Sequence, residues 1–437
     1  MSESWLSSTL FGVVTKVADR MHLSQCDPIR RADERRPSAG SGALTVCHQL
    51  IILVSLLLIL EGALAVWGLH RPAWGDEAHF AETIRFFGNG VTLQSLAHYH
   101  EMSAPLPFII YSFWGRLFGF ALQNLRFLSL LIAFCTFLAS FRLFALVLDG
   151  NLALYAAIFL ALNPYVAGSA IFVFTDMLAL LCLVMACTAV VKRSPAMLLV
   201  SLSAGLLCRQ YLAFFWVAVA VFSLVRLGQQ KRDKQDSWML MACAGSALPL
   251  AALMVLWRGL SPDSSLRSVY LNEPLAFHST AATLYVVLLL VYLVPIIAVR
   301  WRQFYRDPRI LGASFLLSWL YWLAPVTASP SRGMQIDTVG YFHRFLRLVG
   351  SRTSNQIVFY LLFLAALPVL LSIVKGCYTR LSRHDTSFPL LWGFCVVSFL
   401  LVMPMSYLTW EKYFILVLPP ALMLLLNTQS LAEQTGF

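Results

Sequence analysis

Long apolar stretches recur along most of the chain, with short polar segments between them. A stretch of about 20 apolar residues can cross the hydrocarbon core of a bilayer, which is about 30 Å thick. The pattern predicts an all-α, polytopic membrane protein, because transmembrane strands would alternate apolar and polar positions instead. Twelve spans are expected, over residues 46–69, 122–148, 152–171, 174–191, 195–208, 211–227, 238–257, 281–299, 310–328, 355–374, 387–408 and 412–428.

Residues 1–45 differ from this pattern and are predicted to form a flexible cytoplasmic tail, followed by a single transmembrane domain over residues 46–437. The basic flank before the first span places that end inside, so residues 71–121 form an outside loop, on the lumenal or periplasmic side. Lys and Arg are more frequent in the segments that alternation then places inside, which supports this topology. Residues 195–208 are short for a crossing, and we expect them to form part of a helix hairpin whose tip, Arg209 and Gln210, opens into a water-filled cavity.

Composition narrows the class further. The 437 residues are 59% hydrophobic and 12% charged, whereas a soluble domain carries about 25% charged residues. The formal net charge of +11 comes mostly from short loops, so it indicates topology anchors and not a nucleic-acid partner. The nine cysteines show neither metal-ligand spacing nor a disulfide framework.

Several uncommon polar residues fall at or near the same predicted membrane surface. They are Asp76, Glu77, Asp176, Arg209, Gln210 and Lys412. Ionisable groups at membrane depth are costly, so each is a candidate functional residue. The alternative is that each is simply solvated or, for the adjacent acids, that they cap a helix.

The outside loop 71–121 has a pattern of its own. Phe80, Ile84, Phe87 and Val91 repeat at helical spacing, which predicts an amphipathic helix lying on the membrane surface. In the second half of the loop, Pro105 and Pro107 are expected to stop helix formation.

Two further sets of residues could bind ligands. His79, His100 and Glu101 could line one cavity with Asp76, and together they could hold a divalent metal, although their spacing is not a known ligand code. The outside segment 329–354 is basic, and it is either a solvated loop, an error in the topology or a phosphate site, since guanidinium groups grip phosphate bidentately. Its arginines are Arg332, Arg344, Arg347 and Arg352.

At these motifs the chain resembles the GT-C superfamily of membrane glycosyltransferases, and most of all the dolichyl-phosphate-glucose α-1,2-glucosyltransferase family. Four features match in order over roughly residues 70–225: Asp76-Glu77 before a helix, Leu125-Arg126-Phe127, Thr175-Asp176 and Arg209-Gln210. The chain departs from that family at Ser103–Phe108 and after Gln210, which leaves the sugar and the acceptor open. A bacterial relative, similar to protein-mannosyl or aminoarabinose transferases, is an alternative.

The resemblance implies transfer of a sugar, a hexose such as glucose, from a polyprenyl-phosphate donor to a hydroxyl of a lipid-linked glycan, glycolipid or protein. Asp76, beside Glu77, would be the general base of an inverting reaction at the non-cytoplasmic face of the endoplasmic reticulum or bacterial inner membrane. Arg209 would stabilise the leaving phosphate, with Arg126, Lys412 and the basic segment as further candidates, while Gln210 and Asp176 would bind sugar hydroxyls or position the arginines. The rival function is a transporter or flippase for a lipid-linked or anionic substrate.

Overall fold

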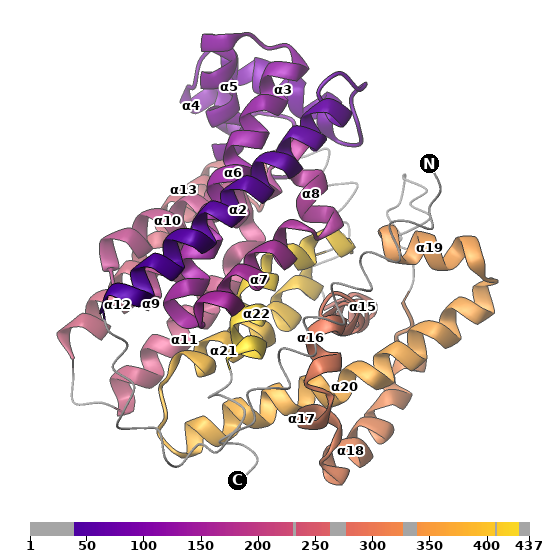
Figure 1. Ribbon diagram of the computed structural model, residues 1–437. Helices are drawn as coiled ribbons and strands as arrows, with labels where there is room; N and C mark the ends of the chain where they lie inside the picture. The colour runs from indigo at the N-terminus through magenta and orange to yellow at the C-terminus, as the bar shows by residue number, and fades with distance from the viewer. Residues whose placement is uncertain (1–38, 230–232, 263–276, 327–338, 407–408, 428–437) are drawn as a thin grey trace.

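The computed structural model describes residues 39–229, 233–262, 277–326, 339–406 and 409–427, and these are helical with no strand (Figure 1). The first helices are α2 (Ala39–Gly68), α3 (Glu77–Gly88), α4 (Leu93–Ala97), α5 (Leu106–Phe118), α6 (Leu122–Val147), α7 (Gly150–Ala161), α8 (Pro164–Ile171), α9 (Asp176–Val191) and α10 (Pro195–Cys208). The 3-10 helix η1 (Gln210–Leu212) precedes α11 (Ala213–Gln229), α12 (Lys234–Ser246), α13 (Leu248–Trp257), α15 (Ser279–Val291), α16 (Val294–Val299), α17 (Trp301–Tyr305) and α18 (Pro308–Ser318). The last elements are η2 (Trp319–Leu323), α19 (Tyr341–Val349), α20 (Arg352–Ser382), α21 (Phe388–Val402), η3 (Met403–Met405), η4 (Glu411–Leu416) and α22 (Leu418–Leu426).

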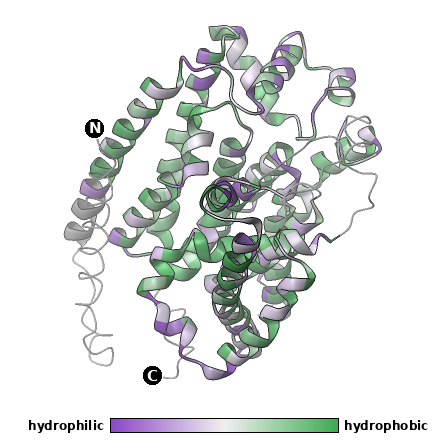
Figure 2. Cartoon of the chain, turned by 90° about the vertical axis from the view of Figure 1, so that its right-hand side faces the viewer, coloured by the Kyte–Doolittle hydropathy of each residue, from purple (hydrophilic) through white to green (hydrophobic). Residues whose placement is uncertain are grey.

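The all-α, multi-pass membrane class is confirmed, but the count of twelve spans is not. Among the described residues, 6 helical segments are long and apolar enough to cross a membrane, or up to 7 if the bent pair α7–α8 is one span. Their apolar residues run along the helix bodies in Figure 2. Prolines explain part of the difference: Pro164 begins α8 after a 67° bend, and Pro295 lies in the first turn of α16, separating it from α15.

Helices α9 and α10 are joined by a turn at Arg193, whereas the expected hairpin tip, Arg209 and Gln210, lies at the other end of α10, before α11. The Arg193 guanidinium is 2.8 Å from the Asp236 carboxylate, which is also 3.1 Å from that of Arg226. Asp233 adds a second ion pair with Arg193. The two basic loops predicted to share the inside face therefore lie together. Most of α9 is buried in the protein.

The outside loop folds into the group α3–α5 at the top of Figure 1. The predicted amphipathic helix exists as α3, and its apolar face packs on the protein: Phe80 packs on Phe108 of α5, with ring centroids 5.4 Å apart, and Phe87 packs on Tyr99. The expectation that Pro105 and Pro107 stop a helix is wrong. They lie at the N-cap and in the first turn of α5, where proline removes no helical hydrogen bond.

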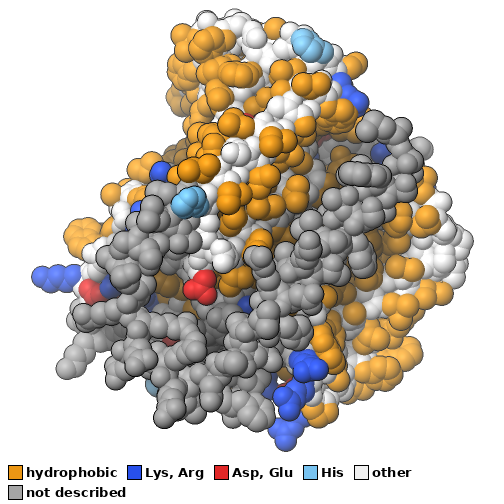
Figure 3. All heavy atoms as spheres, in the orientation of Figure 1, with side chains coloured by type: hydrophobic (Ala, Val, Ile, Leu, Met, Phe, Trp, Pro, Cys, Tyr) orange, Lys and Arg blue, Asp and Glu red, His pale blue; other side chains and the backbone are white. Residues whose placement is uncertain are grey.

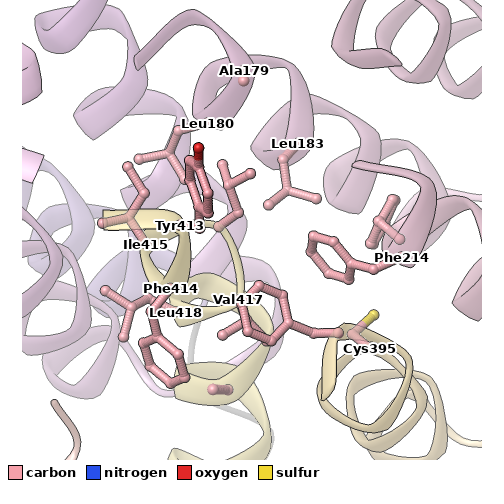
Figure 4. Close-up of a cluster of buried hydrophobic side chains, with 14 of the residues drawn as sticks. Ala179, Leu180, Leu183, Phe214, Cys395, Tyr413, Phe414, Ile415, Val417 and Leu418 are labelled. Atoms are coloured by element: carbon pink, nitrogen blue, oxygen red, sulfur yellow. The ribbon is translucent and has the colours of Figure 1, made fainter. Parts of the chain in front are cut away.

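A buried apolar cluster joins η4 to helices α9 and α11. Tyr413, Phe414 and Val417, from η4 and its C-terminal end, pack beside Leu180 of α9 and Phe214 of α11 (Figure 4). This packing carries the start of η4 toward the start of α9. Residues far apart in the sequence, at positions 176 and 412, are thereby brought to the same end of the bundle.

Candidate functional site

The two adjacent acids at the start of α3 have different environments. Glu77 is fully buried, and its carboxylate pairs with the fully buried guanidinium of Arg126 at 2.5 and 3.0 Å. It also accepts hydrogen bonds from the backbone N–H groups of Trp74, at 2.8 Å, and Val173, at 2.9 Å. All of these partners are supplied by the protein, so Glu77 holds the loop against α6 and does not face a substrate.

Arg126 also binds the C-terminal end of α2. Its guanidinium donates to the carbonyl oxygens of Gly68 at 2.6 Å, Arg71 at 2.7 Å and Pro72 at 3.0 Å, at the C-terminal end of α2. These carbonyls lack helical partners, and a cation also suits the negative end of the helix dipole. A guanidinium engaged in this way suits a positioning role, and the substrate-binding role expected for Arg126 stays a prediction.

The side chain of Asp76, unlike that of Glu77, is accessible to solvent. Its side chain is 48% exposed and makes no capping hydrogen bond to α3, so the capping alternative does not account for it. The Lys412 ammonium lies 3.3 Å from one carboxylate oxygen, and the His79 ring nitrogen Nε2 lies 3.6 Å from the other. His79 and then Lys412 hold the pKa of the Asp76 carboxyl well below its usual range, against the opposing effect of burial.

His79 connects Asp76 to a second, buried carboxylate. Its Nδ1 lies 2.7 Å from Glu101, which also accepts a hydrogen bond from the Thr83 hydroxyl at 3.2 Å. The two carboxylates raise the pKa of His79 to about 9, so the imidazole is a cation at neutral pH. His79 therefore contacts both Asp76 and Glu101, whereas His100 is exposed, and a shared substrate cavity lined by these residues stays a prediction.

This arrangement does not fit a metal ion. Among the described residues there is no group of three or more His, Cys, Asp or Glu side chains that could hold one. The His79 ring lies between the carboxylates of Asp76 and Glu101 and faces each with a different nitrogen, so the three cannot converge on one ion. We therefore derive no chemical step from a metal.

Asp176 and Arg209 form a second, buried ion pair at 3.0 Å, where α9 begins and α10 ends. Asp176 accepts a hydrogen bond from the Tyr211 hydroxyl at 2.6 Å, and Arg209 donates to the Ser103 hydroxyl at 2.7 Å. The Nε of Arg209 is buried and has no hydrogen-bond partner in the part of the chain that the structure describes. The neighbouring Gln210 donates to backbone carbonyls of the first loop and of Leu260, at 2.9 and 3.2 Å, so it ties two segments together.

Lys412 is the link between the two clusters. Its ammonium pairs with Asp76 and lies 5.5 Å from the centre of the Phe174 ring and 5.9 Å from that of Tyr413. The Tyr413 ring packs on Tyr211, with centroids 4.9 Å apart. The expected gathering of Asp76, Asp176, Arg209 and Lys412 at one end of the bundle is thus observed.

Glu411 belongs to the same predicted outside turn as Lys412, although the sequence assigns it no role, and it is fully buried beside this cluster. Its carboxylate accepts hydrogen bonds from the backbone N–H groups of Phe342 at 2.9 Å and His343 at 2.8 Å, and from the Tyr165 hydroxyl at 2.9 Å. An anion here satisfies the free N–H groups at the start of α19. The sequence signal was weak, because Glu411 is a single acid at the edge of an apolar run.

The basic segment 329–354 is only partly described. Arg332 lies outside the described residues, and the side chain of Arg352 is not described. Arg344 and Arg347 are exposed on α19. A substrate-binding role for Arg332 and Arg344 stays a prediction.

Comparisons with known proteins add little. No family model matches the chain, and no curated protein matches it. Among solved structures, the chain is similar to ArnT from Cupriavidus metallidurans in the apo state, with 13% sequence identity and a TM-score of 0.36, over 88% of this chain and 77% of that one. A likeness at this level does not show what this chain does.

Proposed function

We propose that the chain is a membrane glycosyltransferase that moves a sugar from a polyprenyl-phosphate donor to a hydroxyl acceptor, with Asp76 as general base. The observation that carries the proposal is a half-exposed, ionised carboxylate with two cations beside it, at the end of a largely apolar bundle. The order of motifs that resembles GT-C enzymes supports the same reading. A lipid-linked donor also explains why a transferase would devote most of its chain to the membrane.

In the proposed reaction, the Asp76 carboxylate takes the proton from the acceptor hydroxyl as that oxygen attacks the anomeric carbon. The bond between the anomeric carbon and the phosphate oxygen breaks, and the lipid phosphate leaves with the electron pair. A positioned base of this kind contributes roughly 10²–10⁴-fold to the rate. Glu77 and Arg126 would act one step away, by fixing where α3 begins.

The leaving phosphate needs a cation, and Lys412 suits this role better than Arg209. The Lys412 side chain is 20% exposed, whereas that of Arg209 is 9% exposed and already paired with Asp176. In an inverting displacement the base and the leaving oxygen lie on opposite sides of the anomeric carbon. No sugar fits between groups 3.3 Å apart, so Lys412 would leave Asp76 for the donor phosphate.

This exchange has a useful consequence for Asp76. A carboxylate paired with cations is a weak base, and His79 first and then Lys412 hold the pKa of Asp76 low. When the lysine turns to the phosphate, its share of this effect is removed, so the pKa of Asp76 rises and the carboxylate accepts a proton more readily. Donor binding would therefore both place the phosphate and activate the base.

The test uses purified protein, a labelled polyprenyl-phosphate sugar and membrane extract as the acceptor source, with release of free lipid phosphate as the readout. Asp76→Asn keeps the shape of the side chain and removes the base, so we expect turnover to fall about 10²–10⁴-fold with donor binding retained. Asp149→Asn is the matched control, because Asp149 is also an exposed helix N-cap without a side-chain capping bond. Near-normal turnover in Asp76→Asn would overturn the assignment of the base.

Release of the lipid phosphate also separates the proposal from the transporter alternative. A flippase moves a lipid-linked sugar between leaflets with its glycosidic phosphate bond intact. Donor movement without bond cleavage, in vesicles with acceptor present, would favour transport and overturn the transferase.

A further inference from the structure

Helix α19 leaves an apolar face uncovered. Tyr341, Phe345 and Leu348 follow the spacing of one helix face and are 47%, 59% and 81% exposed. The other side of the helix is packed on the protein: His343 is buried and its ring centroid lies 5.6 Å from that of Phe359 in α20. The uncovered face is thus a surface of a helix that is otherwise docked.

Two arginines border this apolar face. At 100° per residue, Arg344 falls next to Leu348 and Tyr341, and Arg347 falls 60° further round the same flank of α19, toward His343. Both are exposed, and the helix carries no acidic residue. The face therefore presents an apolar stripe with positive charge along one edge, which is the composition of helices that lie in the membrane interface.

The connection of α19 to its neighbour fixes its depth. The helix ends at Val349, and α20, whose residues Thr353–Ser382 are a candidate membrane span, begins at Arg352. A helix joined to a span by so short a turn lies where that span leaves the hydrocarbon core. Apolar side chains also cover most of the coloured surface in Figure 3, as expected where lipid surrounds a protein.

The protein holds this helix in place from the other end. Glu411 binds the N–H groups of its first turn, and the Tyr165 hydroxyl accepts from the N–H of Tyr341 at 2.5 Å. The next residue after Glu411 is Lys412, which contacts Asp76. Helix α19 therefore lies on the same side of the bundle as the acidic site.

We propose that α19 rests in the membrane interface and binds the phosphate groups of anionic phospholipids through Arg344 and Arg347, with Phe345 and Leu348 among the acyl chains. A nine-residue helix offers far less than the ~800 Å² per partner of a stable protein interface, which favours lipid over a protein partner. The arginines favour phosphate, which they grip bidentately. This inference goes beyond sugar transfer and does not depend on it.

The experiment is lipid photo-crosslinking of the full chain in nanodiscs. A photoactivatable phosphatidylglycerol or phosphatidylcholine, carrying its reactive group near the headgroup, is activated, and labelled peptides are mapped by mass spectrometry. We expect both lipids to label α19 and phosphatidylglycerol to label it more. One arginine near an anionic surface strengthens binding about fivefold, so the paired variant Arg344→Gln, Arg347→Gln should lower this preference by roughly 25-fold.

Helix α3 provides the control within the same experiment. It carries the exposed Arg85, but its apolar face is covered by α5, so it should show no comparable preference for phosphatidylglycerol. Phe345→Ser should reduce labelling of α19 by both lipids, and added inorganic phosphate should not reduce it. Absence of labelling on α19, a preference that survives loss of both arginines, displacement by free phosphate, or cross-links between two protein chains would each overturn the proposal.

Discussion

Replacing Glu77 by glutamine tests whether this acid acts in catalysis or in positioning. The substitution keeps the size of the side chain and removes its charge. Arg126 would then remain fully buried without a counter-ion, although its bonds to the carbonyls of Gly68, Arg71 and Pro72 could persist. The variant therefore isolates the charge from the shape.

The expected loss is large for a single substitution. Removing one partner of a buried ion pair costs about 3–5 kcal/mol, because the other charge is left uncompensated. The carbonyl oxygens around Arg126 offset part of this cost, so the lower end, about 3 kcal/mol, is expected. That is roughly a 100-fold change in the unfolding equilibrium, since about 1.4 kcal/mol corresponds to a factor of ten.

The chain supplies its own probe for the assay. Cys187, Cys208 and Cys395 are buried and free, so a thiol-reactive dye in detergent reports unfolding as they become accessible. Glu77→Gln should unfold at clearly lower temperature, while the sugar-transfer rate per folded molecule stays within a few-fold of normal. Glu82→Gln is the control, because Glu82 is exposed on the same helix and surface substitutions change stability by about 0.5 kcal/mol or less.

Two results would refute this reasoning. If Glu77→Gln unfolded like Glu82→Gln, the buried pair would not hold the loop. If the transfer rate per folded molecule of Glu77→Gln fell by 100-fold or more, Glu77 would act directly on the substrate and not as a positioning residue.

Three further predictions concern the same end of the bundle. Thermal stability should fall as pH rises from about 6.5 through about 9, because folding raises the pKa of His79 to about 9. The charged imidazole stabilises the fold fully below pH 6.5, and this contribution is lost as the imidazole deprotonates near pH 9. The same pH series measured on His79→Gln should be flatter, and equal slopes would contradict this. Glu411→Gln should speed hydrogen exchange in the first turn of α19 as seen by mass spectrometry, and unchanged protection would show that the acid does not hold the helix. Gly340→Ala should destabilise by about 1–3 kcal/mol, because φ is +153° and a Cβ would meet the Tyr165 hydroxyl; Gly312→Ala, a helical position with open space around it, should be neutral or slightly stabilising, and a similar loss in both would refute the account.

Much of the fold could be predicted from the apolar pattern. Helix α6 matches its expected span at both ends, and α2 matches at its C-terminal end, because a lipid-facing helix must be apolar throughout. The shorter elements could not be predicted as well. A helix such as α9, buried among others, need not be 20 residues long, and its sequence resembles that of a full span.

The candidate site could be predicted as a group but not in its roles. The topology placed Asp76, Asp176, Arg209 and Lys412 at one end, and they meet there. The division of labour between Asp76 and Glu77 depends on a rotation of about 100° around α3, which no pattern in the sequence fixes. What turns Glu77 inward is Arg126, a contact between residues 49 positions apart.

The acids of this region differ in what they can still do. The carboxylates of Glu77, Asp176 and Glu411 are buried and bonded to N–H groups, hydroxyls or arginine supplied by the protein. Breaking the bonds of any of these carboxylates would leave a buried charged group without partners. A substrate would offset that cost only if it replaced every bond that was lost. Asp76 is different, because it is half-exposed and its partners are a lysine and a histidine at 3.3 and 3.6 Å, distances typical of loose ion pairs. In the proposed reaction, a donor phosphate would draw the lysine away without leaving a buried charge behind, and the acceptor hydroxyl would then take its place. The buried acids would fix the geometry, and the exposed one would react.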